Sequence, residues 1–236
     1  MPPALPSYVQ PLFVGTAMLF MGSLYYALSL VQRPSAKRVA IVALLALTAW
    51  SVLQLLLSSA GFYSGISEHP ERLPLMVAPM IVTIVLLFSL PKSRAFIREI
   101  PLFESTLPHI LRVPVEIAIH GFYLGGIAPE IMTYNGQNFD IVSGITAPIV
   151  AWWGVKMGNM DRIYLIIWHF LCLALLGNIV VTAILSTPTP FQQFGLEQPN
   201  VAIFMSPFVL LPSLIVPIVL FLHLAALLRL FSEKGA

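Results

Sequence analysis

The sequence has little charge and almost no cysteine. Only 9% of its 236 residues are charged, against about 25% in a typical soluble domain, so the chain cannot cover a water-facing surface. The single cysteine, Cys172, excludes an internal disulfide, cysteine-rich metal sites and CxxC redox chemistry. Basic residues are scattered in short segments, which argues against nucleic acid as a partner. With 58% hydrophobic residues and a mean hydropathy of +0.90, the composition predicts an all-α integral membrane protein.

No basic segment precedes the first apolar run, so we expect this run to remain as a helix and not to be a cleaved signal peptide. Seven stretches are apolar and close to the length of about 20 residues that a membrane span requires. We therefore expect one domain, residues 1–236, folded as a bundle of seven transmembrane helices. The stretches are 11–31, 39–60, 74–90, 106–126, 139–156, 163–186 and 201–231.

Lysine and arginine are distributed unequally between the two ends of these helices. Of the 12 basic residues, ten lie at one end, Arg72 lies at the other, and Arg112 lies within a span. By the positive-inside rule, the N-terminus is outside and the C-terminus is cytoplasmic, in a bacterial-type cytoplasmic membrane. The ten are Arg33, Lys37, Arg38, Lys92, Arg94, Arg98, Lys156, Arg162, Arg229 and Lys234.

The fourth apolar stretch carries Arg112, Glu116 and His120 at four-residue intervals, which places them on one face of a helix. An ionisable side chain inside a bilayer costs about 2.5 kcal/mol or more unless it faces protein or water, so such residues indicate a functional site. Pro114 leaves the carbonyl of Ile110 without its helical partner. We therefore expect a kink or a late helix start that turns Arg112 and Glu116 toward the bundle interior.

Two interpretations of this triplet are open. In the first it is a relay or substrate path, with Glu116 carrying a proton, His120 as its outer neighbour and Arg112 as the partner of an anion. In the second, Arg112 neutralises Glu116 and the pair only joins helices. The three residues lie at successive depths across the bilayer, which favours the relay.

Other polar residues are candidates for the lining of the same path. Thr146 lies in the fifth stretch and Asn178 in the sixth. Asp140, with Glu130, either lines an outer vestibule or is a solvated loop acid, and the second interpretation is the simpler one. These residues extend the predicted path toward the outer side.

Two local patterns concern helix packing. Gly121 and Gly125 form a GxxxG pattern, which lets another helix approach closely. Pro207, Pro212 and Pro217 recur every five residues in the seventh stretch, where each removes a backbone donor. We expect this helix to be bent or partly unwound, as in helices that line transporter cavities.

His169 and His223 fall at similar depths on the cytoplasmic side, and His109 lies somewhat closer to the interface. If their helices are neighbours, they permit a metal site or a pair of axial haem ligands. The spacing has no signature of the HExxH kind, so the leading interpretation includes no cofactor. Retinal bound as a Schiff base is excluded, because no lysine lies in a helix interior; Lys156 is at a helix end.

The sequence favours a small transporter or channel-like protein, proton-coupled through the Arg112, Glu116 and His120 relay, and not an enzyme. Its partners would be the lipid bilayer and a small molecule or ion, and a homo-oligomer is compatible with this pattern. A membrane-embedded enzyme or redox protein using a metal or haem is the first alternative. A non-catalytic receptor or accessory subunit is the second.

Overall fold

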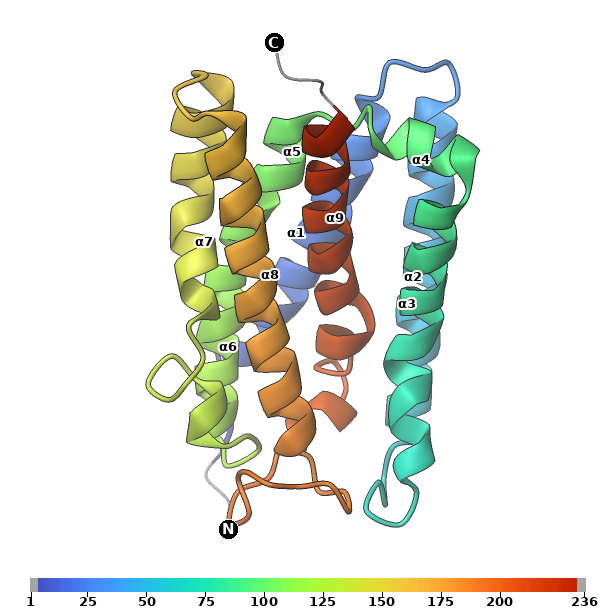
Figure 1. The fold of residues 1–236 in the computed structure, drawn as a ribbon. Helices are drawn as coiled ribbons and strands as arrows, with labels where there is room; N and C mark the ends of the chain where they lie inside the picture. Colours follow the sequence, from blue (N-terminus) through green and yellow to red (C-terminus); the bar gives the residue numbers. More distant parts are fainter. Residues whose placement is uncertain (1–3, 233–236) are drawn as a thin grey trace.

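The computed structural model describes residues 4–232, and the regular elements within this range are all helical. Five of the helices are long and apolar enough to cross a membrane, which confirms the expectation of a helical membrane protein. They are α1 (Val9–Ser29), α2 (Ala36–Ser59), α3 (Leu73–Ser89, extended by the turn η1, Pro70–Arg72), α8 (Arg162–Leu185) and α9 (Val216–Ser232, extended by the π-helical η6, Leu211–Ile215) (Figure 1).

Two further helical segments, which we call rods, are assembled from shorter helices and turns. Residues 102–124 contain α5 (Leu102–Thr106), the 3₁₀ turn η2 (Leu107–Leu111) and α6 (Arg112–Leu124), which follow one another directly. Residues 140–156 contain α7 (Asp140–Ile149) and the π-helical η4 (Val150–Lys156). The short α4 (Pro91–Ile97) joins α3 to α5 at the end of the bundle near the C-terminus (Figure 1), and the turns η3 (Glu130–Met132) and η5 (Ala202–Phe204) lie in the remaining connections.

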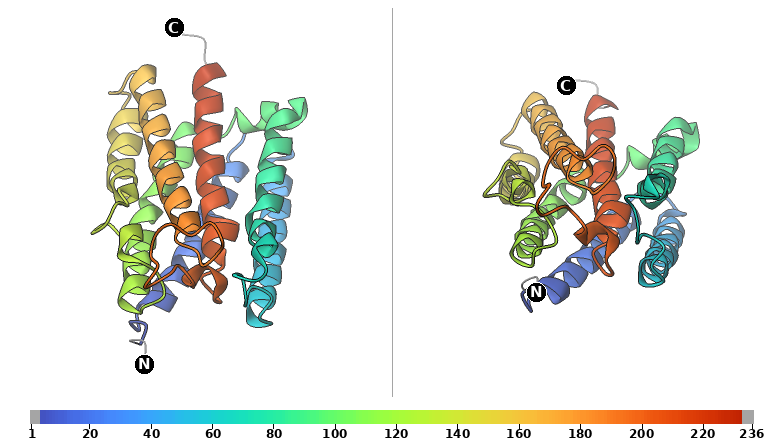
Figure 2. Two further views of the ribbon diagram at one scale, coloured as in Figure 1. Left: turned by 60° about the horizontal axis from the view of Figure 1, so that its bottom comes forward. Right: turned by 90° about the horizontal axis from the view of Figure 1, so that it is seen from below.

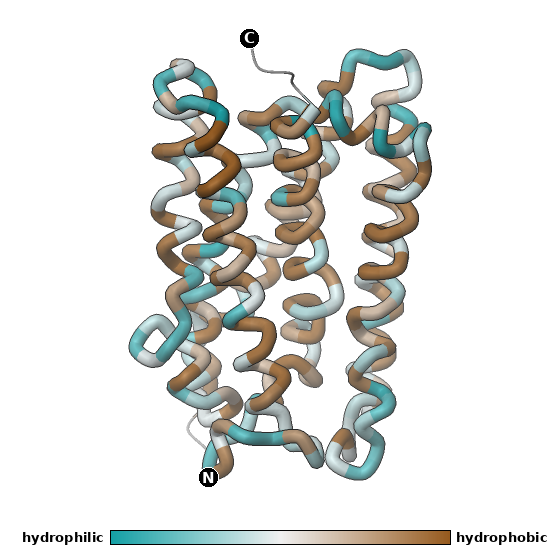
Figure 3. The backbone as a smooth tube through the Cα atoms, in the orientation of Figure 1, coloured by the Kyte–Doolittle hydropathy of each residue, from teal (hydrophilic) through white to brown (hydrophobic). Residues whose placement is uncertain are grey.

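Helix α9 occupies the centre of the molecule. Seen along the bundle, it lies between a group formed by α6, α7 and α8 and the pair α2 and α3, while α1 packs against α6 (Figure 2). Apolar residues dominate the middle of the helices and hydrophilic residues gather toward the connecting segments (Figure 3). Polar residues in the middle of the bundle are therefore exceptions.

Proline determines where α9 departs from regular geometry. In an uninterrupted α-helix the carbonyl of Ser213 would accept a hydrogen bond from residue 217, which is proline. The indole Nε1 of Trp50 in α2 donates to this carbonyl at 2.8 Å instead. The segment from Leu211 to Ile215 is π-helical, so the expectation of a distorted last helix is confirmed.

Two glycines permit close contacts of helix α6 with α1 and with α7. A Cβ at Gly121 of α6 would collide with the side chain of Val9 in α1, which agrees with the interpretation of the GxxxG pattern as packing within this chain. A Cβ at Gly144 of α7 would lie 2.9 Å from the backbone nitrogen of Val113 in α6. Helices α6 and α7 therefore approach each other directly beside Arg112.

A cleft opens beside α2 and α3. It has a volume of about 830 Å³ and mostly apolar walls, which α1, α2, α3, α4 and α9 contribute, although α2 still packs closely against α1. Besides the contact from Trp50, Ser58 donates to the carbonyl of Phe204 at 2.7 Å. At one end of the cleft, Arg33 hydrogen-bonds Glu99 at 2.6 Å, and this contact holds the pKa of Glu99 below its ordinary value. Both side chains of this pair are partly exposed, so it adds little stability.

Candidate functional site

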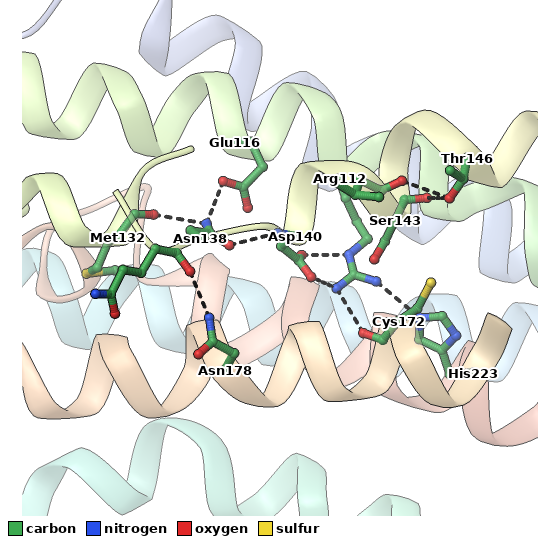
Figure 4. Close-up of polar contacts among 12 residues, drawn as sticks. Arg112, Glu116, Met132, Asn138, Asp140, Ser143, Thr146, Cys172, Asn178 and His223 are labelled. Carbon is green, nitrogen blue, oxygen red and sulfur yellow. Dashed lines mark hydrogen bonds and ion pairs between the residues drawn. The ribbon is translucent and has the colours of Figure 1, made fainter. Parts of the chain in front are cut away.

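The polar residues converge on Arg112, the first residue of α6, whose side chain is buried (Figure 4). Its guanidinium forms a bidentate ion pair with Asp140 at the start of α7, with Nε donating to Oδ2 at 2.6 Å. It also lies 3.2 Å from His223 Nε2 in α9 and donates to the carbonyl of Cys172 in α8 at 3.4 Å. One side chain thus joins α6, α7, α8 and α9.

The local backbone explains why Arg112 points inward. The 3₁₀ turn η2 gives way to α-helix at Arg112, two residues before Pro114, which agrees with the late helix start expected from the sequence. Helix α7 begins with Asp140 partway along the bundle, after a loop that folds back toward α6 (Figure 1). Non-helical backbone at such a depth requires protein partners or water.

Glu116 has a neutral partner. Asn138 in the loop before α7 donates to Glu116 Oε2 at 2.6 Å and to the carbonyl of Met132 at 2.9 Å (Figure 4). Its own oxygen accepts from the backbone nitrogen of Asp140 at 3.0 Å. Sequence reasoning did not include Asn138 among the site residues. Its position two residues before Asp140, typical of an Asx turn, was the only available signal.

A small cavity of about 70 Å³ borders Arg112, Glu116 and Asp140. Its other walls are apolar side chains, mainly of α6, α8 and the segment leading into α9. A water molecule requires roughly 10–15 Å³ of such space, so the cavity has room for a few waters beside these three polar side chains.

The predicted path residues do not form a continuous chain of contacts. Arg112 contacts Asp140 and Glu116 contacts Asn138, whereas the half-buried His120 stacks on Tyr134 with ring centroids 4.9 Å apart. His120 lies outside the lining of the small cavity.

The predicted lining residues also lie away from this cavity. Thr146 accepts a hydrogen bond from the indole of Trp168 at 3.0 Å, and the exposed Asn178 donates to the carbonyl of Gln137 at 2.9 Å. Each joins α8 to α7 or to the loop that precedes it.

Two sequence interpretations require correction. Asp140 is not a solvated loop acid, because its side chain is buried against Arg112. The ion pair that the second interpretation placed between Arg112 and Glu116 is formed by Arg112 and Asp140, 28 residues apart in the chain. The reason is the loop before α7, which folds back into the bundle and presents Asp140 to the guanidinium.

Next to Arg112, three histidines from separate elements meet: His109 of η2, His169 of α8 and His223 of α9, all fully buried. His169 Nδ1 and His223 Nδ1 are 2.9 Å apart, and the ring of His109 stacks on that of His223 at 3.7 Å. Within the described residues, both nitrogens of His109 and Nε2 of His169 have no hydrogen-bond partner. Each buried unsatisfied group costs about 1–3 kcal/mol.

The charges at this site balance only in part. Asp140 neutralises Arg112, whereas Glu116 has a neutral amide as its partner.

No protein-family model, curated protein sequence or solved structure matches the chain. The site is therefore interpreted from its own geometry.

Proposed function

We propose that the chain is a small transporter of seven transmembrane helices in which Glu116 carries a proton coupled to the movement of a small ion or molecule. Five long apolar helices and the rods 102–124 and 140–156 supply the seven spans. Nine of the ten basic residues that the sequence assigns to the cytoplasmic side lie at the end where α9 finishes, which supports an outside N-terminus and a cytoplasmic C-terminus. One of the ten, Lys234, lies outside the described residues.

The observation that carries the proposal is the environment of Glu116. Its carboxyl is buried beside a cavity with room for waters and has an amide, not a cation, as its hydrogen-bond partner. Asp140 already neutralises the nearby Arg112, so no salt bridge fixes Glu116 in its ionised form. A carboxyl placed in this way can exchange a proton with cavity water, and intramembrane carboxyls of this kind mark proton pathways.

The surroundings of Glu116 contain few other ionisable groups. Arg112 and Asp140 share its cavity, and the side chains that α8, η6 and α9 contribute to the lining are apolar. Helix α1, which packs on the other side of α6, contains no acidic, basic or histidine residue. A change in proton flux on altering Glu116 therefore reports on this carboxyl and its immediate neighbours.

Proton flux into proteoliposomes containing a pH-sensitive dye tests the proposal. With Glu116→Gln we expect flux to fall to the level of protein-free liposomes, because the amide is close in shape to the carboxyl but cannot carry a proton. Glu104→Gln, on α5 and outside the cavity lining, is the matched control and should behave as the parent does. Parental flux in a correctly folded Glu116→Gln protein would show that Glu116 carries no proton.

A further inference from the structure

The histidine cluster has features that the proposed proton path does not use. His109, His169 and His223 come from three separate elements, and their nitrogens can be chosen so that all lie within 4.8 Å of one another. A cluster that served only to pack helices would satisfy its nitrogens through protein contacts, yet three of the six have no partner among residues 4–232. The unpaired histidine nitrogens are therefore available to a ligand that is not one of the protein's own side chains.

The tautomers follow from the contacts. Arginine only donates, so the Nε2 atom of His223, at 3.2 Å from Arg112 Nη1, is an acceptor. The proton of a neutral His223 is then on Nδ1, which donates to His169 Nδ1 at 2.9 Å. The proton of a neutral His169 is therefore on Nε2, which has no partner in the part of the chain that the structure describes. These hydrogen bonds join Arg112, His223 and His169, while both nitrogens of His109 remain unpaired there.

We propose that His109, His169 and His223 bind one zinc or copper ion through their imidazole nitrogens. Imidazole suits both metals, and the ligand bonds are about 2.0–2.1 Å long for zinc. Nitrogens around a tetrahedral ion are then roughly 3.3 Å apart, between the 2.9 Å of His169 and His223 and the 4.8 Å limit of the cluster. Closing the site requires the ring of His109 to rotate out of its stack on His223, and three protein ligands then leave a fourth position for water or a substrate.

Metal binding would change the contact of Arg112 with His223. An ion at Nδ1 of His223 takes the place of the proton there, which moves to Nε2 of the same ring. Nε2 can then no longer accept from Arg112, whose pairing with Asp140 remains. Occupancy of the metal site and the hydrogen bond from Arg112 to His223 are therefore alternatives.

The same geometry does not suit haem. Two axial imidazoles stand on opposite faces of a macrocycle, but the ring centroids of His109 and His223 are only 3.7 Å apart, so the two rings are in direct contact. His169 and His223 are in hydrogen-bond contact, which leaves no space for a porphyrin between them. A single metal ion is the ligand that fits the cluster.

Metal binding to the full-length chain in detergent tests this proposal, whatever the outcome for proton flux. The protein is stripped with a chelator and titrated with Zn²⁺, or with Cu⁺ under reducing conditions, against a chromophoric chelator. We expect one equivalent of at least one ion to bind. X-ray absorption of the loaded protein should show imidazole nitrogens at about 2.0–2.1 Å for zinc.

Single substitutions identify the ligands. His109→Gln, His169→Gln and His223→Gln should each weaken binding by more than the roughly 10- to 100-fold that loss of an outer-shell partner causes. His69→Gln, altering an exposed histidine beside Glu71, is the control and should bind as the parent does. The proposal is overturned if neither ion binds at one equivalent, if all three cluster variants bind normally, or if His69→Gln abolishes binding. Where a variant does not fold, the absorption spectrum of the parent still shows whether imidazole nitrogens surround the ion.

Discussion

Arg112 is the residue on which the buried polar contacts of this bundle depend. Its guanidinium reaches Asp140, His223 and the carbonyl of Cys172, and so satisfies donors that would otherwise be stranded in an apolar interior. A buried ion pair adds little net stability compared with well-packed apolar residues, but loss of one partner leaves an uncompensated charge. The pair is therefore better understood as fixing the positions of α6 and α7 than as a source of stability.

Removal of the Asp140 charge tests this dependence. Asp140→Asn should destabilise the protein by about 3–5 kcal/mol, because it leaves the Arg112 guanidinium buried without a counter-charge. Denaturant unfolding in micelles, followed by tryptophan fluorescence, measures the change. Asp161→Asn, at an exposed position before α8 without a side-chain cap hydrogen bond, is the control and should remain close to the parent. Equal stability of Asp140→Asn and the parent would mean that Arg112 finds other partners.

At the residue scale the sequence predicted that Arg112 and Glu116 face the bundle interior, but it did not predict their partners. The four-residue spacing placed Arg112 and Glu116 correctly on an inward face, because helical periodicity is local. The pairing of Arg112 with Asp140 depends on the path of the loop that precedes α7. Similar depths for His169 and His223 followed from counting residues, but their contact required α8 and α9 to be neighbours.

At the element scale, the two interrupted rods carry most of the buried charged and histidine side chains. His109, Arg112 and Glu116 lie in rod 102–124, and Asp140 begins rod 140–156. Both rods contain proline, and neither is a single continuous α-helix. The interruptions and the short α7 leave space in which the loop with Asn138 reaches Glu116. The regular helices form the scaffold of the bundle, and the interrupted rods position buried ionisable side chains.

Close packing of α6 against α7 holds this arrangement, and Gly144 tests it. Gly144→Ala places a methyl group against the backbone of Val113, so we expect a loss of about 1–3 kcal/mol through overpacking. Gly177→Ala, in α8 with no atom near the added methyl, should instead be neutral or stabilise by up to about 1 kcal/mol. Unfolding of both variants in the same detergent gives the comparison. Equal effects would show that the approach of α6 to α7 adapts freely.

At the scale of the whole molecule, apolar length alone recovers only part of the architecture. The stretches 39–60 and 163–186 agree closely with α2 and α8, because these helices contain no proline. The stretch 201–231 begins about ten residues before the long helix, because its first part, which contains Pro207, forms turns and the short η5. The stretches 106–126 and 139–156 coincide with the interrupted rods, where proline shortens each α-helical piece. The number of spans depends on these two rods.

The loop between α6 and α7 distinguishes seven spans from five. If both rods cross the membrane, this loop is outside; if neither does, it is on the cytoplasmic side, and every other connection keeps its side. Asn135 in this loop is exposed, so Asn135→Cys should react with a membrane-impermeant maleimide in intact cells. The native Cys172 is buried and should give little background.

Two reference positions calibrate this labelling experiment. Ser64→Cys, between α2 and α3, should react from outside, and Ser35→Cys, between α1 and α2, should react only after permeabilisation. If Asn135→Cys, like Ser35→Cys, reacted only after permeabilisation, the bundle would have five spans. The rod that carries Glu116 would then not cross the membrane. Labelling of Ser35→Cys in intact cells would instead reverse the orientation. Reaction of Asn135→Cys and Ser64→Cys from the same side of the membrane is the outcome that a proton path through Glu116 requires.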